Sequence, residues 1–184
     1  MSGNMQSVTK AWTAPALLGV ALGMGLLLAF VARGFHGIFY VPFLMPIALG
    51  WALGLALRHV RLRGAMRFGV PVIAAAILGA IVCYGAYHVA VYGRITAFMA
   101  EHLAGFVDLA AGRPGGEAVS AFFTSKTGQT GFAAYLAFLS LPEHQTLHPL
   151  GLWATLGVGY VPTLVAMAAE LGLLIGFAAF AASR

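Results

Sequence analysis

Long runs of apolar residues, separated by short polar segments, are the main pattern in this 184-residue chain. A helix needs about 20 predominantly apolar residues to cross the hydrocarbon of a bilayer. Four stretches meet this requirement, at approximately residues 14–32, 38–57, 68–92 and 161–182. The pattern therefore predicts an all-α integral membrane protein with four transmembrane helices in a single membrane domain.

Prolines mark the entry into several of these spans. Pro15 suits the first turn of the first helix, where its missing N–H would have no intrahelical partner. Pro42 and Pro46 fall in the first half of the second span, where we expect them to bend the helix. Pro162 is predicted to separate an interfacial entry piece, residues 150–160, from the fourth span.

The segment between the third and fourth spans, residues 93–149, has a mixed character. Apolar residues recur at spacings of three and four from Ile95 to Phe106, which predicts an amphipathic helix along the membrane surface. A glycine- and proline-rich cluster at residues 112–116 ends this pattern. A second apolar piece, residues 131–141, is too short to cross a membrane alone, so we predict an interfacial or re-entrant helix.

The composition supports lipid as the solvent for much of the chain. Hydrophobic residues make up 61% of it and charged residues 8%, with a mean hydropathy of +0.91. A soluble domain has about 25% charged residues. The net charge of +5 does not indicate nucleic-acid binding, because most basic residues flank apolar spans. A single cysteine, Cys83, excludes an internal disulfide and any Cys-only metal site.

The short loop between the second and third spans fixes the predicted orientation. It carries four arginines and no acidic residue: Arg58, Arg61, Arg63 and Arg67. Short loops that remain in the cytoplasm keep their Lys and Arg residues. We therefore predict a multi-pass protein of the cytoplasmic (inner) membrane, with both termini in the cytoplasm and residues 93–149 outside. The same arginines are expected to contact membrane lipids through anionic headgroups.

Glu170 is the only acidic residue inside a predicted span. An ionised carboxylate in hydrocarbon costs at least a few kcal/mol, so it must be protonated, hydrogen-bonded or turned toward other protein. It could handle protons or ions, or it could tie helices together or dock a partner. The second interpretation is favoured because no second acidic residue and no Lys or Arg lies within a span. Its expected neighbours by depth are Trp51, Cys83 and Tyr84.

The third span carries Tyr84, Tyr87 and His88 at positions i, i+3 and i+4, on one stripe of the helix. Such a stripe could line a pocket for a quinone or a lipid headgroup, with His88 as a donor. It is also typical of the aromatic belt at a membrane–water boundary. The predicted depth of these residues favours the belt.

Two candidate metal sites are incomplete. Glu143, His144 and His148 lie within a few residues of one another and could hold a metal ion, but flanking prolines argue against a regular helix there, which favours a polar loop. Haem would need two histidines at a shared depth, and His36 with His88 is the one pair that approaches this. We therefore predict no cofactor.

Small residues recur at four-residue spacing in three of the spans, at Gly19 and Gly23, Gly50 and Gly54, and Gly172 and Gly176. In lipid, such faces allow helix backbones to approach closely. The contact between one pair of helices needs fewer than three such faces. We therefore expect a tight bundle or packing against other subunits.

These features favour a non-catalytic integral membrane subunit that packs within a larger complex, with other membrane subunits or with copies of itself. The alternative is a small transporter or channel-forming oligomer in which Glu170 lines the path. A membrane enzyme acting on lipid or quinone, built around Tyr84 and His88, ranks third. The sequence has no dinucleotide or phosphate loop and no paired membrane aspartates, so an enzyme is not favoured.

Overall fold

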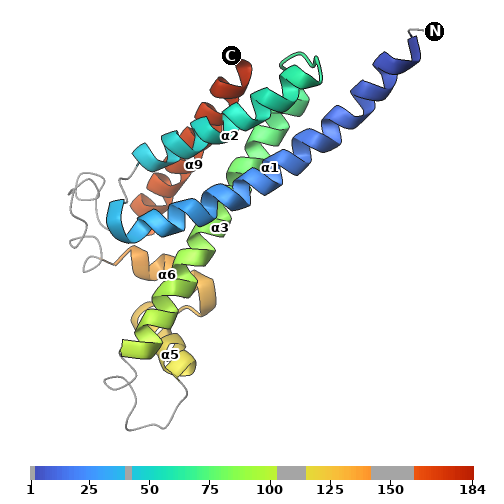
Figure 1. The fold of residues 1–184 in the computed structure, drawn as a ribbon. Helices are drawn as coiled ribbons and strands as arrows, with labels where there is room; N and C mark the ends of the chain where they lie inside the picture. Colours follow the sequence, from blue (N-terminus) through green and yellow to red (C-terminus); the bar gives the residue numbers. More distant parts are fainter. Residues whose placement is uncertain (1–2, 40–42, 103–114, 142–159) are drawn as a thin grey trace. The chain divides into compact units, whose positions relative to one another are not determined.

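The computed structural model describes residues 3–39, 43–102, 115–141 and 160–184, and within these ranges the chain is helical with no strand. Its helices are shown in Figure 1: α1 (Gly3–Phe39), α2 (Leu44–Arg63), α3 (Val70–His102), α5 (Gly115–Thr127), α6 (Gly131–Leu139) and α9 (Tyr160–Ser183). Three segments are long and apolar enough to cross a membrane: Ala14–Phe35, Val70–Glu101 and Thr163–Ser183. The fold is therefore that of an all-helical membrane protein.

The boundaries of the first two helices differ from the predicted ones. The α1 helix begins at Gly3, so Pro15 lies inside it and not in its first turn. The α2 helix begins at Leu44 rather than at residue 38, so Pro46 falls in its first turn; Pro42 lies outside the described residues. Three of the arginines that were expected in a loop, Arg58, Arg61 and Arg63, extend α2 because Arg is a good helix former, whereas Arg67 lies after the helix.

The chain divides into two compact units. Unit 1 comprises Met1–His88 and Ala168–Arg184, and unit 2 comprises Val89–Met167. Unit 1 therefore holds α1, α2, the first part of α3 and most of α9. Unit 2 holds the end of α3 together with α5 and α6.

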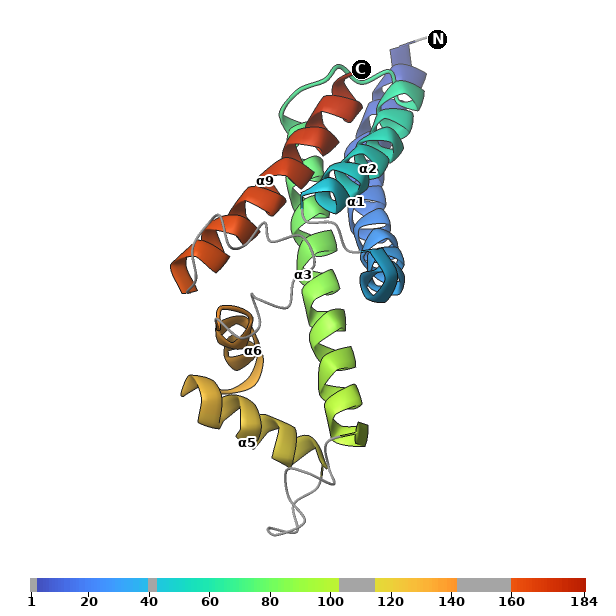
Figure 2. The same ribbon diagram turned by 90° about the vertical axis from the view of Figure 1, so that its left-hand side faces the viewer.

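In unit 1, α2 and α9 run parallel and in close contact (Figures 1 and 2). A Cβ added to Gly50 would overlap the carbonyl oxygen of Leu174, and one added to Gly54 would overlap that of Ala178. The residue numbers rise together along both helices, which is the pattern of a parallel pair. The absence of two side chains thus brings the two backbones together, as in other small-residue contacts in lipid.

A second close contact in unit 1 joins α1 to α3. A Cβ on Gly25 would lie 2.7 Å from the carbonyl oxygen of Gly79, and one on Gly79 would lie 3.0 Å from that of Ala21. The side chain of Leu53, from α2, also reaches Gly79 and is fully buried. Gly79 is therefore the point where α1, α2 and α3 meet.

Four glycines of the predicted small-residue faces make no such contact. A Cβ added to Gly19, Gly23, Gly172 or Gly176 would meet no atom of the described residues within 4 Å. Within this chain, only the Gly50 and Gly54 pair packs against another helix in the way that was expected. Spacing alone identifies a face of a helix, but not what covers that face.

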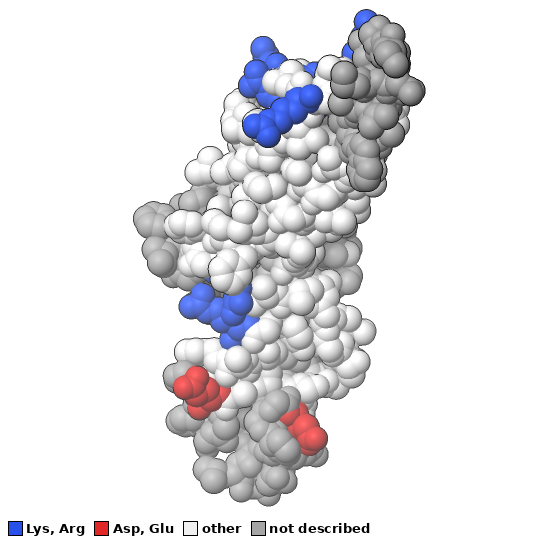
Figure 3. All heavy atoms as spheres, turned by 45° about the vertical axis from the view of Figure 1, so that its right-hand side comes forward, with Lys and Arg blue, Asp and Glu red and all other residues white. Residues whose placement is uncertain are grey.

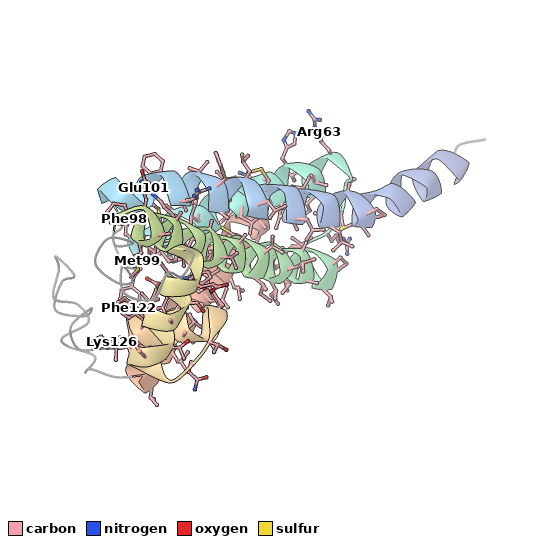
Figure 4. The ribbon with its side chains drawn as sticks, turned by 90° about the horizontal axis from the view of Figure 1, so that it is seen from below. Arg63, Phe98, Met99, Glu101, Phe122 and Lys126 are labelled. Carbon is pink, nitrogen blue, oxygen red and sulfur yellow. The ribbon has the colours of Figure 1, made fainter. Side chains whose placement is uncertain are left out.

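Unit 2 is a small aromatic-rich helical cluster. Its buried centre is formed by Val119 and Phe123 of α5 and Ala134 of α6. The end of α3 packs on this centre through Tyr92, Ile95, Met99 and Ala100. The labelled side chains of Met99 on α3 and Phe122 on α5 can be followed in Figure 4.

The structure corrects the expectation of a separate surface helix after residue 92. No break follows Tyr92, and the helix continues to His102. The three- and four-residue spacing of Ile95 and Met99 serves to pack α3 on α5 and α6. The α5 helix was not predicted, whereas α6 falls within the apolar piece that was expected to be interfacial or re-entrant.

Substitution of Gly54 by Ala should separate α2 from α9. The new methyl group would meet the Ala178 carbonyl oxygen and the Ala181 side chain, so we expect a loss of about 1–3 kcal/mol of unfolding free energy. Gly85→Ala is the matched control, because its Cβ meets nothing and Ala is the better helix former by about 1 kcal/mol. Reversible unfolding in mixed micelles measures both, and equal effects would contradict the close contact.

Candidate functional site

The carboxyl group of Glu170 joins three helices of unit 1. Glu170 lies on α9 with 1% of its surface exposed. The phenol of Tyr84, on α3, donates a hydrogen bond to its Oε2 atom at 2.9 Å. The backbone N–H of Phe43, directly before α2, donates to its Oε1 atom at 3.3 Å. Both oxygens therefore accept a bond from a different helix or its cap.

The position of this carboxyl group at the start of α2 has an electrostatic reason. The first turn of α2 contains no acidic residue, and its N-cap, Phe43, makes no side-chain capping bond. A helix N-terminus carries a partial positive charge and unsatisfied N–H groups. Phe43 also has a φ angle of 65°, which is uncommon for a bulky residue. Glu170 thus supplies, from another helix, the acceptor that the local sequence of α2 lacks.

Of the neighbours expected for Glu170 by depth, the structure places Tyr84 in hydrogen-bond contact with it. Trp51 instead packs on Phe180, with a ring-centroid separation of 5.8 Å. Cys83, which directly precedes Tyr84 on α3, is buried. Depth in a span selects residues at the right level, but the rotation of each helix decides which of them meet.

The aromatic stripe of α3 is packed inside unit 1. The His88 ring lies edge-on to Tyr84 at 4.5 Å and to Tyr87 at 5.1 Å between centroids. Tyr87 and His88 are both buried. An apolar cavity beside Tyr84 and Tyr87 has a volume of only about 10 Å³, close to that of a single water probe. A quinone ring would not enter it without displacing the helices.

The metal hypotheses gain no support from the described residues. Glu143, His144 and His148 lie outside them, as does the side chain of His36. Within the described part of the chain, no group of three His, Cys, Asp or Glu residues is close enough to hold an ion. His88 is in contact with two tyrosine rings, as described above.

The arginines of α2 lie at the end of the helix opposite Glu170. The Nη2 atom of Arg61 donates to the carbonyl oxygen of Ser183, at the end of α9, at 3.4 Å. The Arg184 guanidinium lies over the Phe180 ring at 4.7 Å from its centroid. Each end of the parallel α2–α9 pair is therefore joined by one polar contact, in addition to the glycine contacts between them.

Two hydrogen-bond partners at the ends of the α2–α9 pair could not be predicted from the side chains in the sequence. The donor at Phe43 and the acceptor at Ser183 are both backbone groups; any residue type would supply the carbonyl, and any except proline the N–H. By contrast, the recurrence of small residues at Ala169, Gly172 and Gly176 was a usable signal. These three residues line an apolar groove on α9.

Replacement of Glu170 separates a structural role from a titrating one. Glu170→Gln keeps both contacts, because the amide oxygen accepts from Phe43 and the amide nitrogen donates to the Tyr84 oxygen. We expect a change of less than about 1 kcal/mol in unfolding free energy. Glu170→Leu leaves two buried donors unsatisfied and should cost about 2–5 kcal/mol. Thermal unfolding in mild detergent compares them; similar losses in both would contradict the hydrogen-bonding role.

Comparison with known proteins adds no function to this geometry. No protein-family model matches the chain, and no curated protein or solved structure matches it significantly. The functional conclusion therefore comes from the contacts described above.

Proposed function

We propose that the protein is a non-catalytic integral membrane subunit with four transmembrane helices. They are α2 and the three helices that hold the long apolar segments, α1, α3 and α9. The α2 helix is paired with α9 from Phe43 and Glu170 at one end to Arg61 and Ser183 at the other. The paired segment of α9 is apolar and long enough to cross a bilayer. A 20-residue helix is about 30 Å long, which is the thickness of the hydrocarbon. A helix paired with a span over that length shares its environment.

The proposed orientation places both termini in the cytoplasm of a cell with an inner membrane. The start of α1, the end of α2 and the end of α9 lie at the same end of unit 1 (Figures 1 and 2). That end carries Arg58, Arg61, Arg63, Arg67 and Arg184. Basic residues next to spans favour the cytoplasmic side.

The observation that carries the proposed role is the groove along α9. It has a volume of about 700 Å³ and is lined by small residues together with Phe43, Leu173, Phe177 and Phe180. Its small residues are Ala169, Gly172 and Gly176. In lipid, helices associate where small residues allow close backbone contact. The groove is therefore suited to a transmembrane helix from another subunit.

The transporter alternative receives less support from the same geometry. A residue that lines an ion path must be reached by water at some stage of transport. Glu170 is 1% exposed and accepts hydrogen bonds from two donors that belong to neighbouring elements. These contacts favour a role in joining helices.

Assembly can be tested by filling the groove. Gly172→Leu with Gly176→Leu places two large side chains where none fits against a helix, so we expect the assembly to dissociate. Native mass measurement in mild detergent should show a complex for the unchanged chain and a single chain for the variant. Gly85→Leu is the control, because Gly85 also has open space around it but lies outside the groove. A monomeric unchanged chain, or a complex that survives the double substitution, would contradict the proposal.

A further inference from the structure

The arginine-rich end of unit 1 has no acidic side chain to balance its charge. Arg61 and Arg63 lie in the last turn of α2, with Arg58 one turn earlier. Basic side chains gather at this end in Figure 3. The sequence of unit 1 has one acidic residue, Glu170, and its carboxyl group lies beside Phe43 at the opposite end of α2. No acidic side chain of unit 1 therefore pairs with these arginines.

Two of these guanidinium groups have buried donors that are not used within the described residues. The Nε atoms of Arg58 and Arg61 are buried and have no hydrogen-bond acceptor there. Arg61 as a whole is only 9% exposed, although its Nη2 atom reaches Ser183. An unsatisfied buried donor costs about 1–3 kcal/mol, and more when it is charged. An oxygen ligand that accepts from both groups would remove this cost.

The chemistry of the donors selects the ligand class. A guanidinium group presents a planar fork of N–H donors that fits two oxygens of a phosphate. Arg58 and Arg61 are three residues apart on α2, so their side chains start from neighbouring positions on the helix surface. A ligand shared by the two guanidinium groups requires this neighbouring placement.

The surface below Arg58 indicates where the phosphate comes from. Trp51 and Leu55 are exposed by 42% and 43%. Together with Arg58 they follow one another at spacings of four and three residues, which places them on one face of α2. This face is an apolar stripe with a guanidinium group near its end. A free phosphate ion makes no use of such a stripe, whereas a lipid chain does.

We propose that this end of α2 binds the phosphate of an anionic phospholipid. Arg58 and Arg61 donate to the phosphate oxygens, and an acyl chain lies along Leu55 and Trp51. Arg63 and Arg67 are exposed and add only general attraction to a negative surface. This site is distinct from the groove on α9, and neither proposal depends on the other.

Binding of phosphatidylglycerol in mixed micelles tests the site, measured at about 0.5 M salt, where the screening length is only about 4 Å. Arg58→Gln with Arg61→Gln should weaken binding about ten- to thirtyfold, at roughly 1 kcal/mol per arginine. Arg63→Gln with Arg67→Gln removes the same charge from exposed positions and should change it less than about threefold. Equal losses in the two pairs would overturn the site.

Two further ligands separate the possible sources of the phosphate. Phosphatidylcholine and inorganic phosphate should each bind at least about tenfold more weakly than phosphatidylglycerol to the unchanged chain. Equal affinity for phosphatidylcholine would overturn the requirement for an anionic lipid. Equal affinity for inorganic phosphate would overturn the role of the apolar stripe.

A further measurement keeps all the arginines, so its result does not depend on whether the arginine variants fold. In a chain that carries Trp12→Phe and Trp153→Phe, Trp51 is the remaining tryptophan. Phosphatidylglycerol with brominated acyl chains should quench its fluorescence at lower mole fractions than brominated phosphatidylcholine. Identical quenching curves for the two lipids would overturn the proposal.

Discussion

The contact between α2 and α9 is the constraint on which the rest of unit 1 depends. Water does not drive helices together inside a bilayer, so close packing and satisfied polar groups must do so. Gly50 and Gly54 allow the backbones to touch. At one end Glu170 accepts from the N–H of Phe43, and at the other Arg61 donates to the carbonyl oxygen of Ser183. These contacts hold α2 parallel to α9. They do so although α2 is not among the three helices that are long and apolar enough to be identified as spans by length and composition.

The distribution of charge in unit 1 follows from the same arrangement. Its single acidic residue is placed at a helix N-terminus, where a carboxyl group is favoured, and is joined to Tyr84. The arginines of α2 gather at the other end, where α2 and α9 both finish and the partial charge of the helix ends is negative. The proposed lipid site follows from this separation. Glu170 contacts the start of α2, whereas Arg58 and Arg61 lie near its end, so the carboxyl group does not neutralise them.

The sequence was sufficient to predict an all-helical membrane protein and to select Glu170 and Tyr84, because an acid in an apolar span is costly and needs a partner. It did not predict the Phe43 contact, since the donor is a backbone group. It misplaced Trp51, because depth does not specify helix rotation. It also missed α5, whose helix begins within the glycine-rich cluster. A separate helix after Tyr92 was also expected, but α3 continues through this residue, and the apolar residues Ile95 and Met99 pack against α5 and α6.

The central claim is that α2 crosses the membrane beside α9, so that both helices end on the same side. Single cysteines at Ala65, Arg184 and Gln129, in a Cys83→Ser chain, can be labelled with an impermeant maleimide in oriented vesicles. The account predicts that Ala65→Cys and Arg184→Cys react from the cytoplasmic side only, and Gln129→Cys from the outer side only. Labelling of Ala65→Cys and Arg184→Cys from opposite sides would contradict it.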